Sequence, residues 1–91
     1  TWRSSVTPLA KLLEAALFSS AHPVALADLK AMVTDAETTA EDVTAALNDL
    51  RHHYDDDGHG VELIEVAGGW QILTRPEYTE TIERAQLAAR P

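Results

Sequence analysis

The 91-residue sequence contains no cysteine, so it can form no disulfide bond and offers no thiolate nucleophile or sulfur ligand for a metal. A small domain that folds without disulfides suits a reducing compartment, and we therefore expect a cytoplasmic protein. The sequence also lacks an apolar run near the roughly 20 residues that a membrane helix needs. Lys11, Glu14, Asp28 and Lys30 interrupt the most apolar segments, so we expect no contact with a membrane.

Basic residues are also scarce in this chain. Seven lysines and arginines stand against fifteen acidic residues, which gives a net charge of -8. That sign opposes the release of counterions that drives most nucleic-acid binding. The basic residues are dispersed rather than clustered: Arg3, Lys11, Lys30, Arg51, Arg75, Arg84 and Arg90. The composition therefore predicts no strong direct binding to DNA.

Apolar residues at helical spacing predict two helices in the first third of the chain. The first begins at Pro8, which suits the first helical position because it has no amide hydrogen to leave unpaired, and extends to about residue 20. His22-Pro23 ends it, because the residue before a proline is pushed out of the helical region. The second helix is shorter and has no hydroxyl side chain to cap its start. Its apolar positions are Leu26, Leu29, Met32 and Val33.

The remaining pattern predicts a third helix, a hairpin and a final helix. Thr38 and Glu41 have the spacing of a capping box, and the acidic run at residues 55–57 with its following glycine ends the third helix. Gly68 and Gly69 supply the positive φ angles that a turn between two strands needs. The third helix repeats Val43, Ala46, Leu47, Leu50 and Tyr54, the strands span Val61–Val66 and Trp70–Thr74, and the final helix repeats Tyr78, Ile82, Ala85 and Ala89.

This order of elements predicts a mostly α fold with a small β-hairpin (α+β). Three helices closed by a two-stranded wing describe a winged helix-turn-helix, here followed by a C-terminal helix. We expect one domain over residues 9–91 after an N-terminal tail over residues 1–8. A domain this short buries limited apolar surface, so a partner would help to stabilise it.

Three stretches of the sequence resemble the amino-terminal winged helix of the segregation and condensation protein B family. They are Leu12-Leu13-Glu14-Ala15-Ala16-Leu17-Phe18, His22-Pro23-Val24, and the wing from Gly60 to Tyr78, with its paired glycines before Trp70 and its Thr74-Arg75-Pro76 exit. The wing is the most specific of the three. The resemblance implies a non-enzymatic, nucleoid-associated subunit that forms a homodimer, binds the kleisin subunit (segregation and condensation protein A), and through it joins the SMC ATPase in chromosome condensation and segregation. It also implies that the second winged helix of the family is absent from this chain.

The sequence offers weak candidates for chemistry, and we predict neither an enzyme, a cofactor nor a metal site. His52, His53 and His59 lie near three aspartates, but two adjacent helical residues point roughly 100° apart, so His52 and His53 cannot easily share one ion. No serine comes with a patterned histidine and acid. Gly68-Gly69 joins two strands rather than a strand and a helix, so a hairpin turn explains it better than a phosphate loop does.

The better candidates are apolar residues that would contact another protein. Alternation places Val61 and Leu63 on one face of the first strand and Ile64 and Val66 on the other. Both faces of the wing are thus partly apolar, and the face away from the core must be covered either by the final helix, through Tyr78 and Ile82, or by another protein. The candidate interaction residues are Phe18, Ile64, Val66, Trp70, Leu73 and Tyr78.

The alternative function is that of a DNA-binding transcription regulator, because the third helix of a winged helix often enters the major groove. Glu41, Asp42 and Asp49 on that helix would repel phosphates, and only Arg51 would attract them. We therefore favour an assembly subunit over a regulator.

Overall fold

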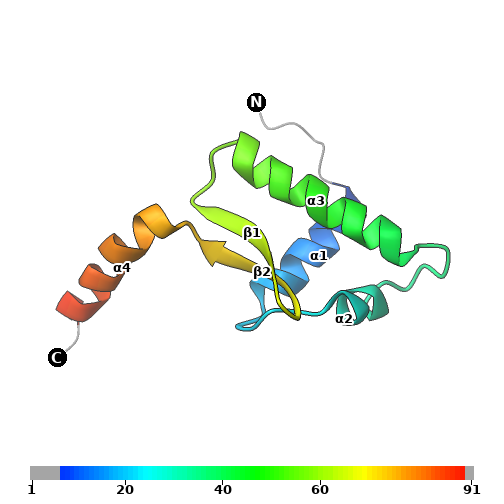
Figure 1. Ribbon diagram of the computed structural model, residues 1–91, viewed down its shortest axis with the longest axis horizontal. Helices are drawn as coiled ribbons and strands as arrows, with labels where there is room; N and C mark the ends of the chain where they lie inside the picture. The colour runs from blue at the N-terminus through cyan, green and yellow to red at the C-terminus, as the bar shows by residue number, and fades with distance from the viewer. Residues whose placement is uncertain (1–6, 90–91) are drawn as a thin grey trace.

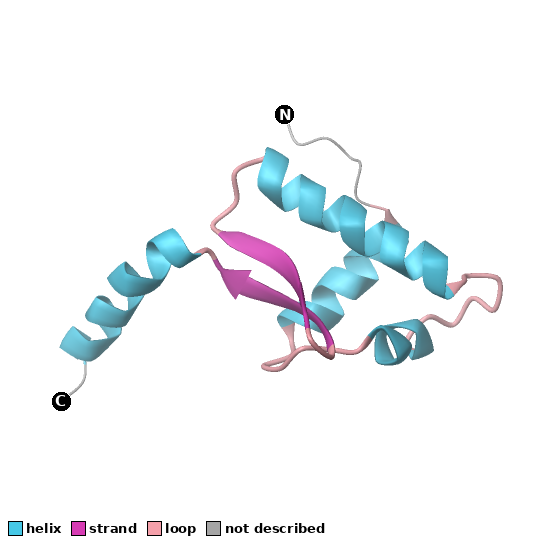
Figure 2. Ribbon diagram, in the orientation of Figure 1, coloured by secondary structure: helices cyan, strands magenta, loops and turns pink. Residues whose placement is uncertain are grey.

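The computed structural model describes residues 7–89, with side chains up to Gln86. Three helices come first, then a hairpin and a last helix: α1 Pro8–Phe18, α2 Leu26–Ala31, α3 Ala40–Asp56, β1 Val61–Val66, β2 Gly69–Thr74 and α4 Pro76–Ala89. In Figure 1, α1 and α2 lie on one side of the long α3, and the two strands extend from the same body as a wing. Figure 2 shows the same division by secondary structure. The winged helix-turn-helix prediction is confirmed.

The starts of the helices follow local chemistry. Pro8 occupies the first turn of α1, and the Thr7 side chain accepts a hydrogen bond of 3.1 Å from the Ala10 amide. The helix ends at Phe18, about two residues earlier than the sequence predicted. Ala25 precedes α2 without any side-chain cap, as expected, and α2 is only six residues long.

The capping box of α3 lies one residue later than predicted. Thr39, rather than Thr38, is the N-cap, and its hydroxyl accepts a hydrogen bond from the Asp42 amide while the Asp42 carboxylate accepts one from the Thr39 amide. Aspartate completes this box because a carboxylate at the third helical position reaches back to the cap as glutamate does. The shift changes the boundary of α3 but leaves its apolar stripe as predicted.

The wing is an antiparallel hairpin whose turn consists of Ala67 and Gly68. Gly68 has a φ of 93°, as a tight hairpin turn requires. Gly69 does not have a positive φ and is the first residue of β2, so that part of the turn prediction is wrong. Glycine is needed at position 69 for a different reason, because a Cβ atom there would lie 2.4 Å from the carbonyl oxygen of Val24.

That close approach exists because Val24 pairs with the wing. The amides of Val24 and Trp70 each donate a 2.9 Å hydrogen bond to the other residue's carbonyl oxygen. The segment between α1 and α2 thus adds a single antiparallel bridge to β2. This bridge fixes the wing to the helical body through its backbone as well as through its side chains.

The core lies where α1, α2 and the wing meet α3. All five predicted apolar positions of α3 are buried there. The other buried residues come from α1, α2 and the wing: Ala10, Leu13, Leu17, Leu29, Leu63 and Trp70. Met32, predicted to continue the stripe of α2, is instead exposed just after the helix ends, whereas Val33 packs against the core.

Helix α4 extends away from this body (Figure 1). Every described side chain from Pro76 to Gln86 is exposed, and α4 has no extensive contact with another described element. The side chain of Ala89, predicted to share its apolar face, lies outside the described residues. Among the described helices, none is long and apolar enough to cross a membrane.

Candidate functional site

The two faces of the wing have different environments. Leu63 and Trp70 point into the core, and Trp70 is only 4% exposed. Ile64 and Val66 are half-buried on the opposite face, where Leu73 is exposed. Trp70, one of the predicted interaction residues, is therefore a core residue, whereas Ile64, Val66 and Leu73 form an apolar outer wing face.

The outer wing face is not covered by the final helix. Tyr78 and Ile82 are one helical turn apart on α4, and they are 49% and 42% exposed. The alternative in which these two residues fold back over the wing is wrong, because α4 leaves the body directly after β2 and extends outward. Both the outer wing face and the apolar face of α4 thus remain available to another protein.

Phe18 lies on the other side of the wing. It ends α1, is 81% exposed, and borders a shallow depression of about 400 Å³. The depression is lined by Glu14, Ala15, Phe18, Tyr54, His59, Val61 and Ile72. Val61 and Ile72 belong to the core face of the wing, so this surface and the outer wing face are separate.

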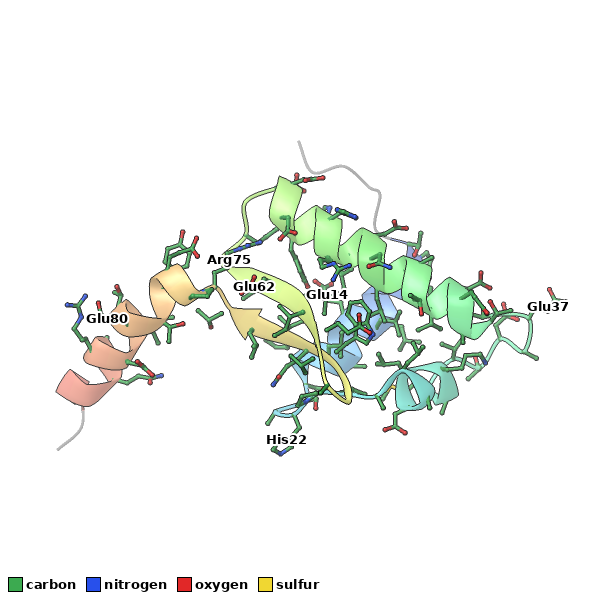
Figure 3. The ribbon with its side chains drawn as sticks, in the orientation of Figure 1. Glu14, His22, Glu37, Glu62, Arg75 and Glu80 are labelled. Atoms are coloured by element: carbon green, nitrogen blue, oxygen red, sulfur yellow. The ribbon has the colours of Figure 1, made fainter. Side chains whose placement is uncertain are left out.

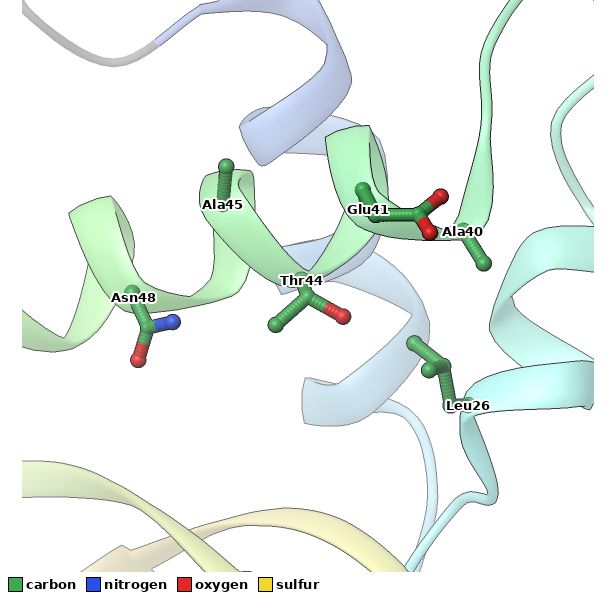
Figure 4. A pocket seen from close by; sticks show the side chains of 6 residues that line it. All are labelled: Leu26, Ala40, Glu41, Thr44, Ala45 and Asn48. Atoms are coloured by element: carbon green, nitrogen blue, oxygen red, sulfur yellow. The ribbon is translucent and has the colours of Figure 1, made fainter.

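The third helix reads DNA in many winged helices, but the depression beside the first half of α3 has no basic residue in its lining here. Figure 4 shows the depression between α3 and the start of α2, with the Glu41 carboxylate, Thr44 and Asn48 around it. Its other lining residues are Leu26, Ala40 and Ala45. A phosphate group would meet a carboxylate at this surface, and no lysine or arginine.

The two arginines nearest the wing are held by other parts of the protein. The Arg51 guanidinium lies 5.4 Å from the centre of the Trp70 ring and donates a hydrogen bond to the Asn48 side chain. Arg75 donates to the backbone oxygens of His59, at 2.6 Å, and of Tyr54, at 3.2 Å. Both cations are therefore engaged within the fold rather than offered to phosphates.

Arg75 also connects the end of the wing to α3. Its guanidinium lies 2.9 Å from an Asp55 oxygen and 4.0 Å from a Glu62 oxygen, and Figure 3 shows Arg75 beside Glu62 at the base of the wing. The hydrogen bond to Asp55 raises the pKa of Arg75 above its usual value. A permanent cation here neutralises part of the acidic run that follows α3.

The structure brings together only some of the histidine and aspartate residues considered from the sequence. His52 is exposed, whereas His53 is largely buried and its Nδ1 lies 3.3 Å from an Asp57 oxygen. The His59 ring returns to the same place, with its centroid 5.7 Å from that of His53. The pair considered from sequence, His52 and His53, is not brought together, but His53 and His59 are.

Tyr54 joins α3 to α1 through a polar contact that the sequence analysis did not single out. Its hydroxyl donates a hydrogen bond to the Glu14 carboxylate. Burial raises the pKa of Tyr54 above its ordinary value of 10.0, and the hydrogen bond and the charge of Glu14 add to the shift. Forty residues separate the two partners in sequence, so only a helix-packing prediction could have paired them.

The sequence has relatives with known names. Residues 11–91 match the family described as segregation and condensation complex subunit ScpB. Segregation and condensation protein B of Syntrophotalea carbinolica is 37% identical over 83 residues, covering 91% of this chain and 40% of that protein. The protein of the same name from Desulforamulus reducens is 36% identical over 72 residues, covering 79% of this chain and 38% of that protein. The chain thus spans about two fifths of these relatives.

Solved structures have the same fold. The crystal structure of ScpB from Mycobacterium tuberculosis superposes with a TM-score of 0.81 at 25% identity, covering 99% of this chain and 55% of that one. A crystal structure of a dimer of the ScpB N-terminal domain complexed with ScpA peptide gives a TM-score of 0.75 at 19% identity. It covers 90% of this chain and 92% of that one.

Proposed function

The chain belongs to the segregation and condensation complex subunit ScpB family, and we propose that it acts in chromosome segregation and condensation as a protein-binding module rather than an enzyme. In this proposal it pairs with a second copy of itself and binds a kleisin peptide, and through the kleisin it joins the SMC ATPase. The working protein is cytoplasmic and associated with the nucleoid. Residues 9–91 act as the first of two winged helices.

The uncovered apolar surface supports pairing with a second copy, and it is the observation that carries the proposal. Leu73 on the wing and Tyr78 and Ile82 on α4 are all exposed, although a monomeric domain of this size has little apolar surface to leave in water. Two chains of net charge -8 repel each other, so their association needs apolar contact. Homodimers most often use one patch that meets its own copy.

The depression beside Phe18 supports a second partner. An 81% exposed aromatic side chain next to apolar Val61 and Ile72 can anchor one side chain of a peptide. This surface lies on the opposite side of the wing from Ile64, Val66 and Leu73. We assign it to the kleisin, because the self-association surface then stays free while the peptide is bound. The solved ScpB N-terminal domain that shares this fold was crystallised as a dimer with ScpA peptide.

Two charge substitutions test the assignment of partners to surfaces. Leu73→Asp should lower the mass measured by light scattering to that of a monomer while leaving kleisin co-elution in place. Phe18→Asp should do the reverse. Thr74→Asp is the matched control for Leu73, because Thr74 is also exposed but alternates to the other face of β2. A wild-type chain that stays monomeric throughout a concentration series would refute self-association by this domain.

A gel shift separates this proposal from a DNA-binding function. At physiological salt we expect no sequence-dependent shift, because the net charge of -8 and the engaged Arg51 and Arg75 leave little counterion release to drive binding. A sequence-dependent shift at submicromolar protein would favour the regulator instead.

A further inference from the structure

The end of α3 and the turn after it bring together three side chains that can bind a metal ion. His53, Asp57 and His59 each offer one ligand atom, and these atoms all lie within 4.8 Å of one another. Two imidazoles and one carboxylate are donors that Zn²⁺ and similar divalent transition metals accept. The group stands apart from the outer wing face, although His59 also lines the depression beside Phe18.

The backbone accounts for this convergence. His53 and Asp57 are four residues apart at the end of α3, so their side chains lie on one side of the helix. Gly58 follows with a φ of 71°, a conformation that reverses the chain. The His59 amide then donates a 3.2 Å hydrogen bond to the Tyr54 carbonyl oxygen, and this bond returns His59 to the last turn of α3.

The site is also held in place by its surroundings. The His53 side chain is only 8% exposed, so packing limits its rotation. The His59 ring meets the Tyr54 ring edge-on at 5.4 Å, and the His59 carbonyl oxygen accepts the 2.6 Å hydrogen bond from Arg75. Such packing and hydrogen bonding around the ligands is what orients a metal site.

Arg75, which contacts the His59 carbonyl oxygen, is directed at a different carboxylate. Arg75 forms its 2.9 Å ion pair with Asp55, whereas Asp57 lies beside His53. Asp55 therefore neutralises the arginine, and Asp57 keeps its negative charge for the histidine side of the turn. Asp57 can therefore act as a metal ligand together with His53, whereas Asp55 is paired with Arg75.

We propose that His53, Asp57 and His59 together bind one Zn²⁺ ion or a chemically similar divalent metal. With metal–donor bonds of about 2.0–2.2 Å, two donors of a tetrahedral site are about 3.3–3.6 Å apart. The 3.3 Å between His53 Nδ1 and the Asp57 oxygen already has this value. The remaining spread of up to 4.8 Å must close by rotation of the His59 side chain, because the hydrogen bonds of its amide and carbonyl groups hold its backbone in place. The bound ion would fix the end of α3 to the start of the wing.

Titration of the untagged protein with ZnCl₂ and CoCl₂ tests this proposal, because a histidine tag would mask the site. We expect one Zn²⁺ per chain by calorimetry, and an unfolding temperature higher by about 5 °C or more at saturating metal. Co²⁺ should give the visible absorption bands of a four-coordinate ion. His59→Gln and Asp57→Asn should each weaken binding at least about tenfold. Circular dichroism checks that each variant remains folded. Two different ligands are changed so that, if one variant does not fold, the other still tests the site.

The chain contains its own controls. His52→Gln and Asp56→Asn change exposed neighbours that lie outside the cluster, and His22→Gln changes an exposed histidine in the loop after α1, labelled in Figure 3. These three variants should bind zinc as the wild type does. Binding that falls equally in His52→Gln and His59→Gln, or wild-type protein that shows neither stoichiometric Zn²⁺ nor four-coordinate Co²⁺, overturns the proposal.

Discussion

Helices α3 and α4 have the same sequence pattern and opposite environments. Apolar residues recur at spacings of three and four in both helices. In α3 this stripe is buried against α1, α2 and β1, whereas on α4 Tyr78 and Ile82 are exposed. Periodicity therefore identifies a face that excludes water, but it does not say whether this chain or another covers that face.

The contrast also separates two sources of stability. Among residues 7–86, whose side chains the structure describes, the buried hydrophobic residues all lie between Ala10 and Trp70, so the body from α1 to the wing has its own core. Helix α4 is 14 residues long and unsupported in this structure, and isolated helices of that length are marginal in water. We infer that the body folds by itself and that α4 gains its stability from a partner.

The largest expected effect comes from removing apolar volume inside the body. Leu47 on α3 is fully buried, and Leu47→Ala should lower the free energy of unfolding by about 2–5 kcal/mol, through lost burial and the cavity left behind. Ile82→Ala on α4 is the matched change and should cost less than about 0.5 kcal/mol at low protein concentration. Urea denaturation measures both. Similar losses in the two variants would mean that α4 packs on the body after all.

The next effect concerns how the wing is fixed to the body. Gly69→Ala would place a Cβ atom 2.4 Å from the Val24 carbonyl oxygen, and since that atom belongs to the backbone, the Val24–Trp70 bridge must open. We expect a loss of about 1–3 kcal/mol. Gly58→Ala meets no neighbouring atom and suffers only from a φ of 71°, so it should cost about 1 kcal/mol, at the lower end of the penalty for a left-handed non-glycine residue. Thermal melts that rank Gly58→Ala as the more damaging change would contradict the bridge.

The sequence predicted the features that depend on local patterns and missed those that depend on contacts between separate elements. The stripe of α3 was sufficient to predict its buried face, and the alternation in the wing separated its two faces without showing which of them is buried, because each pattern is local. The bridge between Val24 and Trp70 and the contact between Tyr54 and Glu14 were not predicted, since both depend on how separate elements meet. Gly69 was assigned to the turn, whereas it begins β2 and is a glycine because the Val24 backbone approaches closely. Such an approach leaves no local pattern in the sequence.

The candidate interaction residues divide in the same way. Leu73 is exposed on the outer wing face, as a contact residue requires, whereas Trp70, also included among the contact residues, is buried in the core. A tryptophan is a common interface anchor, and only its position over the core of this fold shows that it is buried. Likewise, the return of His59 to His53 depends on the turn at Gly58, which spacing along a helix does not describe.

A smaller effect tests the polar contact that joins α1 to α3. Tyr54→Phe removes the hydrogen bond to Glu14 and should cost about 1 kcal/mol at neutral pH. The folded-state pKa of Tyr54 is raised above 10.0, so its stabilisation is complete below pH 10 and is lost as the pH rises from there towards the folded-state value. Tyr78→Phe, on the exposed α4, should change little. A difference between wild type and Tyr54→Phe that stays constant above pH 10 would contradict this linkage.

The smallest expected effect on stability comes from the largest change in sequence. A chain that ends at Arg75 loses all of α4 but keeps each buried hydrophobic residue that the structure describes and the contacts of Arg75 with His59, Tyr54 and Asp55. Its unfolding temperature, measured at a concentration where the wild type is monomeric, should lie within a few degrees of the wild-type value, since about 4–8 °C corresponds to 1 kcal/mol in a domain of this size. At higher concentration the unfolding temperatures of the two chains should diverge, because self-association stabilises only the chain that retains Tyr78 and Ile82.

Light scattering on the same samples should show a monomer for the truncated chain and a concentration-dependent dimer for the wild type. A truncated chain that still dimerises would place the contact on the outer wing face alone. One that unfolds at low concentration would show instead that α4 belongs to the body.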